Sequence, residues 1–231
     1  MKQLLTTGIV LARTDFGEAD RIVTFLTPDH GKLRLMARGV RKIKSKLAGG
    51  IELFSISELT FMYGKGEIGT LISCRLHKHY GQIVQNIDRV QQGYALLSAI
   101  NKATEDEPEP AYFHLVQAAL AALDDADIPG PLIDAWFQAQ LLRLGGHTPN
   151  LRTDSDGQVL KADEQYDFDL GSVAFRVSPH GHSGAKQIKI LRLLFSDNQP
   201  AKLIQVQGVV DIIPDLAPLL QLLINSYIVR K

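Results

Sequence analysis

Thiols are almost absent from this sequence of 231 residues, because Cys74 is its single cysteine. One thiol cannot form an internal disulfide, and it excludes the cysteine-rich zinc-finger frameworks. Cys74 lies in the alternating segment LISCRLH, so we expect it to be a small buried residue of a strand. The sequence also lacks a run of about 18 consecutive apolar residues, and its first residues are too polar for a secretory signal. We therefore expect a cytoplasmic protein without a membrane span.

Motifs of the common enzyme classes are missing as well. No GxxxxGK[ST] or GxSxG segment occurs, so nothing supports a phosphate-loop nucleotidase or a serine hydrolase. His147, His180 and His182 could offer three imidazoles to a metal, but they fall in loops rich in glycine and proline. We interpret them as solvated side chains. We predict no catalytic residue, no metal site and no cofactor.

Acidic residues are missing from one long stretch, between Asp29 and Glu52, and this stretch is strongly basic. Its seven cations are Lys32, Arg34, Arg38, Arg41, Lys42, Lys44 and Lys46. The first part, KLRLMAR, alternates charged and apolar residues and predicts a strand with one basic face. The second part, GVRKIKSKLAGG, is bracketed by glycines and predicts a mobile loop. The pattern is typical of a phosphate track for nucleic acid, and a solvated hairpin tip is the alternative.

The formal net charge is zero, but the charge is distributed unevenly along the chain. Residues 1–90 carry 14 Lys+Arg and 8 Asp+Glu, whereas residues 91–231 carry 11 and 17. The N-terminal part is therefore the candidate for a polyanionic partner. Such a division also suggests separate domains.

Five short strand patterns, joined by glycine-rich turns, precede the first helical pattern. They cover residues 4–12, 21–26, 32–38, 51–63 and 68–77. Five strands of this length predict a small closed β-barrel. An OB-fold and an SH3-like barrel have similar strand counts. We favour the OB-fold, because the long loop after the third strand carries the charge.

From residue 79 onward the pattern is mainly helical. Helices are predicted over residues 79–104, 111–124, 131–144, 186–195 and 216–229, and residues 151–177 return to strand character with turns at Asp156-Gly157 and Gly171. The predicted fold class is α+β: an N-terminal five-stranded OB-fold barrel followed by an α-helical bundle with a small β-hairpin insertion. We assign residues 1–80 to the barrel, 81–149 to a helical domain, 150–183 to the insertion and 184–231 to helices that return to the bundle.

Aromatic residues lie close to the basic stretch. Phe54, Phe61 and Tyr63 fall in one predicted strand. Bases stack on exposed aromatic rings at about 1–3 kcal/mol each. Phe54 and Phe61 are seven residues apart, on opposite faces of a regular strand, so one of them could be exposed, and Tyr63 shares the face of Phe61. We take Phe61 and Tyr63, with the seven cations, as candidate DNA-binding residues; the alternative is that the phenylalanines belong to the core.

These residues resemble a known family. The run ARGVRKIKSKLAGG at residues 37–50, followed by Phe54 and by Glu58-Leu-Thr, resembles the signature of the bacterial recombination mediator RecO. GIVL at residues 8–11 and GEADR at residues 17–21 are similar to the first two strands of that family. LLRLG at residues 141–145 resembles the end of its helical bundle. The strong similarity covers residues 1–80.

The resemblance implies an N-terminal OB-fold, a helical bundle and a C-terminal insertion with β-structure. It also implies that the protein binds single- and double-stranded DNA, anneals complementary strands, and works with RecR and single-stranded-DNA-binding protein to load recombinase. Many members carry four zinc-binding cysteines after the bundle, but residues 150–183 contain none, so we expect metal-free hairpins there. A second hypothesis remains: a protein-interaction module whose basic loop docks an acidic tail of a partner, with incidental DNA contact.

Overall fold

The computed structural model describes residues 2–64, 66–107 and 109–228. The chain divides into two compact units, Met1–Ala126 and Asp127–Lys231. This division falls inside residues 81–149, which we assigned to one helical domain, and the assignment of four domains stays a prediction. Val229, where the last predicted helix ends, lies outside the described residues.

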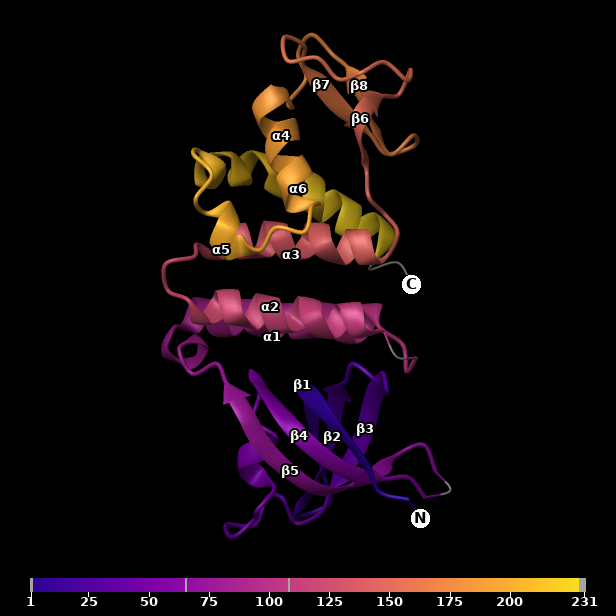
Figure 1. Cartoon of the computed structure of the whole chain (residues 1–231), viewed down its shortest axis with the longest axis vertical. Coiled ribbons are helices and arrows are strands. Elements are labelled where there is room, and N and C mark those ends of the chain that lie inside the picture. The colour runs from indigo at the N-terminus through magenta and orange to yellow at the C-terminus, as the bar shows by residue number, and fades with distance from the viewer. Residues whose placement is uncertain (1, 65, 108, 229–231) are drawn as a thin grey trace. The chain divides into compact units, whose positions relative to one another are not determined.

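A closed five-stranded barrel forms the first part of unit 1 (Figure 1). Its strands are β1 (Leu4–Phe16), β2 (Asp20–Leu26), β3 (Lys32–Ala37), β4 (Ser55–Met62) and β5 (Gly69–His79), in the order β1-β2-β3-β5-β4. β3 and β5 are parallel, and the other neighbouring pairs are antiparallel. This closed Greek-key barrel confirms the predicted OB-fold and the α+β class.

Alternation along the strands separates the barrel core from its surface. On β3 the side chains of Leu33, Leu35 and Ala37 are buried, whereas Arg34 between them is exposed. Successive side chains of a strand point to opposite faces, so this pattern confirms the predicted strand with a basic outer face. Cys74 is buried in the same core, as the sequence predicted.

Several predicted boundaries were wrong, among them the start of β4 and the start of the first long helix. β4 begins at Ser55 rather than at residue 51, because Ala48–Gly50 form a 3₁₀ turn (η1) and Phe54 has a φ of 58°, which interrupts an extended strand. The first long helix, α1 (Ile87–Ala103), begins eight residues later than the predicted start at residue 79. β5 extends to His79, and the Asn86 side chain accepts hydrogen bonds from the first backbone N–H groups of α1, which fixes its start.

α1 and α2 (Pro110–Asp124) belong to the same unit as the barrel. Lys32 Nζ, on β3, donates hydrogen bonds to the carbonyl oxygens of Asn101 (3.0 Å) and Thr104 (2.6 Å) at the C-terminal end of α1. The ring of Phe54 packs edge-on against Tyr94 of α1, with 5.6 Å between the centroids. These contacts fix α1 on the barrel.

Unit 2 contains a second set of helices and a small sheet. Its elements are α3 (Gly130–Leu144), β6 (Asn150–Asp154), β7 (Tyr166–Asp169), β8 (Ala174–Val177), α4 (Ala185–Leu194), α5 (Pro200–Leu203) and α6 (Val209–Tyr227). β7 and β8 form the predicted antiparallel hairpin. The predicted hairpin turn at Asp156-Gly157 is also confirmed, because Asp154 N donates to the Gln158 carbonyl and an antiparallel bridge flanks the turn. The parallel pairing of β6 with β8 was not predicted. The insertion is therefore a three-stranded sheet.

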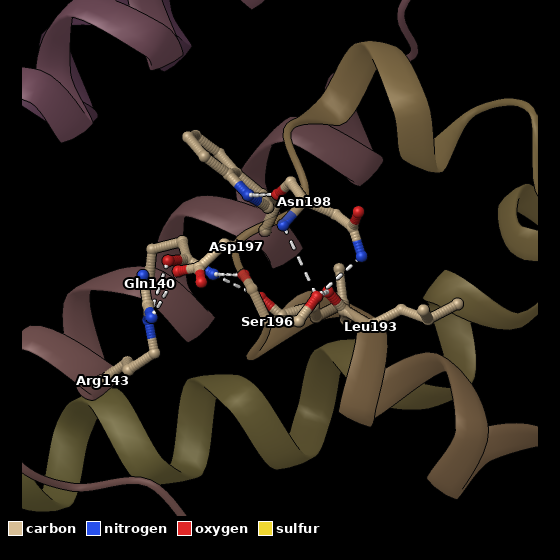
Figure 2. Close-up of polar contacts among 8 residues, drawn as sticks. Gln140, Arg143, Leu193, Ser196, Asp197 and Asn198 are labelled. Atoms are coloured by element: carbon tan, nitrogen blue, oxygen red, sulfur yellow. Dashed lines mark hydrogen bonds and ion pairs between the residues drawn. The ribbon is translucent and has the colours of Figure 1, made fainter.

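A group of hydrogen bonds joins α3 to the segment after α4 (Figure 2). The buried Gln140 Nε2 donates to the carbonyl oxygens of Leu194 (2.6 Å) and Ser196 (2.8 Å), and Arg143 Nη1 contacts Asp197 at 2.8 Å. The last carbonyl groups of a helix have no partner within the helix. The Gln140 side chain supplies a hydrogen-bond donor for the last carbonyl group of α4, where the chain turns toward α5.

α6 is long and apolar enough to cross a membrane by length and composition alone. It begins at Val209, before the predicted start at residue 216, and Pro214 and Pro218 lie inside it. Its buried side chains, such as Leu216 and Leu220, pack in unit 2, where α6 contacts α3 and α4. A core helix of a soluble protein meets the same two criteria.

Candidate nucleic-acid interface

The basic loop, which we define as residues 38–50, starts against the turn between β1 and β2. Gly39 N donates to Asp20 Oδ1 at 2.7 Å, and Arg41 N donates to the Ala19 carbonyl at 2.9 Å. Gly39 has a φ of 63°, a conformation that glycine adopts without strain. Val40 is buried in the barrel core. The N-terminal end of the loop is therefore fixed at one end of the barrel.

The other end of the basic loop is fixed on β5. Cys74 Sγ donates to the Gly50 carbonyl at 2.9 Å, and Ser57 Oγ donates to the same oxygen at 2.7 Å. Burial raises the pKa of the Cys74 thiol to about 11, so the thiol stays a neutral donor. The predicted mobile loop is thus attached to the barrel at both ends.

Between these two ends the loop presents its positive charges to solvent. Arg38, Lys42, Lys44 and Lys46 are exposed, and so is Arg34 on the neighbouring face of β3. Within the described ranges none of these five side chains has an acidic partner at ion-pair distance. Ile43, between two of the lysines, is fully exposed. A solvated cluster of unneutralised cations is suited to bind phosphates.

Two of the seven predicted cations are already engaged within the protein. Lys32 binds the end of α1, as described above, so its ammonium group has a structural role. Arg41 Nη1 lies 3.5 Å from an Asp15 carboxylate oxygen and donates to the Gly17 carbonyl at 3.3 Å. The hydrogen bond from Arg21 and, more weakly, the charge of Arg41 lower the pKa of the Asp15 carboxyl. Arg41 therefore attaches the loop to the β1–β2 turn.

The aromatic predictions need one correction. Phe61 has no exposed surface and belongs to the barrel core, so it cannot stack on a base, and Phe54 is 2% exposed. The inference that one of the two is exposed fails, because Phe54 leaves the regular strand and packs against α1. Tyr63 is half-buried, and its ring packs edge-on against Phe61 with 5.9 Å between the centroids.

Phe16 is an exposed aromatic residue that we did not predict as a DNA-binding residue from the sequence. It ends β1, next to the turn that holds the basic loop, and it is 52% exposed. An exposed ring beside a cationic loop can stack on a base. Its position immediately before Gly17, at a polar turn, was the signal in the sequence.

A pocket of about 330 Å³ lies at the other end of β3. Its lining includes Arg34 and Tyr63, but also the acidic residues Glu67 and Asp106. Burial and, more weakly, the charge of Asp106 raise the pKa of the Tyr63 hydroxyl. Two carboxylates make this pocket a less favourable phosphate site than the loop.

The three histidines that we interpreted as solvated side chains are not part of a metal site in the described ranges, where no group of three or more His, Cys, Asp or Glu side chains could hold an ion. The ring of His147 stacks on the ring of Tyr227, with 4.5 Å between their centroids, whereas His182 Nδ1 lies 3.0 Å from Asp167 Oδ1. The absence of a bound metal in solution stays a prediction.

The fold and its surface define an OB-fold protein with a cationic loop at one end of the barrel, a class in which nucleic-acid binding is common. Comparison with protein families agrees with the sequence resemblance. Residues 1–80 match the N-terminal domain of recombination protein O, and residues 85–201 match its C-terminal domain. The chain belongs to the recombination protein O (RecO) family.

Curated relatives carry the name DNA repair protein RecO. The protein from Dehalococcoides mccartyi is 34% identical over 148 residues, which cover 64% of this chain and 58% of the relative. The protein from Streptomyces coelicolor is 36% identical over 151 residues, 62% of this chain and 60% of the relative. The match to the protein from Halalkalibacterium halodurans is longer, with 26% identity over 228 residues, 95% of this chain and 86% of the relative. The first two alignments span about three fifths of the relatives.

Proposed function

We propose that this protein binds single- and double-stranded DNA, anneals complementary strands and helps to load recombinase on protein-coated single strands in recombinational DNA repair. The observation that carries the proposal is the group of exposed, unneutralised cations on the basic loop of an OB-fold barrel. The names of the relatives support the place of this activity in DNA repair. The protein acts in the cytoplasm without catalysis, and its partners are DNA, RecR and single-stranded-DNA-binding protein.

Phosphate binding by the loop provides a physical route to annealing. Arg38, Lys42, Lys44 and Lys46 neutralise phosphates and release the counterions condensed on the strand. Two complementary strands held on one positive surface repel each other less than they do in water, so they can pair without ATP. The exposed ring of Phe16, and Tyr63 as a second candidate, stack on bases beside this surface.

The loop binds phosphates rather than reading a base sequence. Its lysines and arginines stand on long, solvated side chains outside any strand or helix, so the backbone does not direct them at base edges. Binding is therefore expected to be similar for unrelated sequences.

The test is a triple variant, Arg38→Ala, Lys42→Ala and Lys44→Ala, compared with wild type. Each single-strand phosphate contact contributes about 0.7 to the slope of log affinity against log salt, so losing three contacts flattens the slope by roughly 2. Affinity for two unrelated oligonucleotides should fall equally, and annealing should slow in parallel. The thermal melting curve should be unchanged, because these side chains are exposed.

A matched control removes three exposed cations from unit 2, by Lys186→Ala, Lys189→Ala and Lys202→Ala. This control should retain the wild-type slope and annealing rate. A wild-type slope in the loop variant would refute the role of the loop. If the wild type bound an acidic peptide but failed to anneal DNA, the result would instead support the protein-interaction module.

A further inference from the structure

The C-terminal end of β5 forms a second exposed, basic surface on the barrel. Arg75, Leu76, His77, Lys78 and His79 are all exposed, although consecutive residues of a strand point to opposite faces. β5 carries a shift in its pairing with β4 between Leu76 and Lys78, which interrupts the regular alternation. Four of the five side chains carry or can carry a positive charge. This surface is separate from the β2–β3 face that OB-folds commonly use.

The register of the barrel places this surface next to the basic loop. β3 ends at Ala37, and its last residues pair in parallel with Gly69 and Thr70 at the start of β5. β5 therefore continues past the end of β3, in the direction in which the basic loop leaves. The loop returns to β5 at the hydrogen bond between Cys74 and Gly50. Arg75 follows this contact directly, so the β5 surface begins where the loop ends.

The cations of the β5 surface form no ion pair with side chains of the described residues. Across β4, Arg75 lies opposite the exposed Glu58, whereas Leu76, Lys78 and His79 lie opposite the uncharged residues Ser57, Ile56 and Ser55. The 3₁₀ turn η1, which contacts β5, contains only alanine and glycine. Within the described residues, neither Arg75 nor Lys78 forms an ion pair. Lys78 Nζ lies 4.7 Å from the centroid of the Tyr80 ring, which holds the ammonium group at the surface.

We propose that residues 75–79 of β5 form a second phosphate track that continues the basic loop and binds the sugar–phosphate backbone of a DNA strand. This inference rests on the proposed function and adds a surface to it. The charges of Arg75 and Lys78 bind phosphates, and the exposed rings of His77 and His79 can donate hydrogen bonds to phosphate oxygens beside them.

The test uses the full chain, a fluorescent single-stranded oligonucleotide and salt titrations. Arg75→Ala with Lys78→Ala should flatten the slope of log affinity against log salt by about 1.4, because two contacts of about 0.7 each are lost. The control pair Lys186→Ala and Lys189→Ala, exposed in unit 2, should retain the wild-type slope.

The outcomes distinguish this inference from the proposed function. If the wild type does not bind DNA, both fail. If the wild type binds through the basic loop, but the Arg75→Ala, Lys78→Ala variant shows the wild-type salt slope, the second track is refuted and the proposed function stands. Melting curves of each variant show that a changed slope does not come from unfolding.

Discussion

At the scale of single residues, the contact between Gly50 and Cys74 determines how the basic loop returns to the barrel. Gly50 is buried, and its carbonyl accepts hydrogen bonds from Cys74 Sγ and Ser57 Oγ. A Cβ atom at Gly50 would lie 2.6 Å from the Cys74 carbonyl oxygen and 2.8 Å from its carbonyl carbon. These are backbone atoms of a barrel strand, so they cannot move aside easily.

We predict that Gly50→Ala destabilises the protein by about 1–3 kcal/mol, the range for inserting an atom into a packed site. Chemical denaturation gives the change in the free energy of unfolding. Gly49→Ala is the matched control, because a Cβ atom there would meet nothing within 4 Å, and it should change stability by less than about 0.5 kcal/mol. Equal stability of the two variants would contradict the close approach of the loop to β5.

Individual side chains show how far the sequence predicts this site. It identified every cation of the basic stretch and the burial of Cys74. It could not separate Lys32 from Arg34, two residues apart on one face of β3, because the carbonyl groups that bind Lys32 are 69 and 72 residues away in the chain. Phe61 was misassigned because strand alternation shows that two residues face opposite ways, but not which of the two faces lies inside the closed barrel.

At the scale of elements, β3 has two functions. Its inner face completes the barrel core, and its outer face holds α1 through Lys32 and presents Arg34 to solvent. The end of a helix carries partial negative charge, so an ammonium group there is stabilising. Neighbouring residues of the same charge therefore serve different purposes.

We predict that Lys32→Met lowers the stability of the protein, whereas Arg34→Met weakens its electrostatic binding to DNA. Lys32→Met removes the donor to the α1 carbonyl groups and should destabilise the protein by about 1.5–3 kcal/mol, as expected for hydrogen bonds from a charged group, with little change in the salt slope of DNA binding. Arg34→Met should leave stability nearly unchanged and flatten that slope by about 0.7. Thermal or chemical denaturation and salt titrations of both variants provide the comparison. A flattened slope for Lys32→Met would restore its assignment to the DNA interface.

The sequence predicted the type of most elements better than their boundaries. Alternation and turn residues located all five barrel strands, and apolar spacing located α2, α3 and α4 within one residue of their ends. The start of α1 was missed because β5 continues to His79 through pairing with β4, a partner distant in sequence. The parallel pairing of β6 with β8 was missed for the same reason. Local patterns do not report such contacts.

At the scale of the whole molecule, the charge asymmetry lies inside unit 1. Residues 1–80 carry 13 Lys+Arg and 7 Asp+Glu, whereas residues 81–126, with α1 and α2, carry 2 and 7. Each unit is close to neutral. Residues 1–126 carry 15 Lys+Arg and 14 Asp+Glu, and residues 127–231 carry 10 Lys+Arg and 11 Asp+Glu. Attraction for DNA should therefore come from the local surface of the barrel rather than from the net charge of a unit.

We predict that a fragment of residues 1–126 binds single-stranded DNA with the salt slope of the full chain, and that residues 127–231 alone do not bind at the same salt concentration. The first fragment keeps the basic loop, the end of β5 and the α1 carbonyl groups that bind Lys32. A fragment cut at residue 80 would lose these acceptors and the α1 side chain that packs on Phe54, so it should be less stable even though it contains the whole barrel. Circular dichroism establishes that each fragment is folded, and salt titrations with one oligonucleotide compare binding. Equal binding by folded residues 127–231 would contradict the assignment of the DNA interface to the barrel.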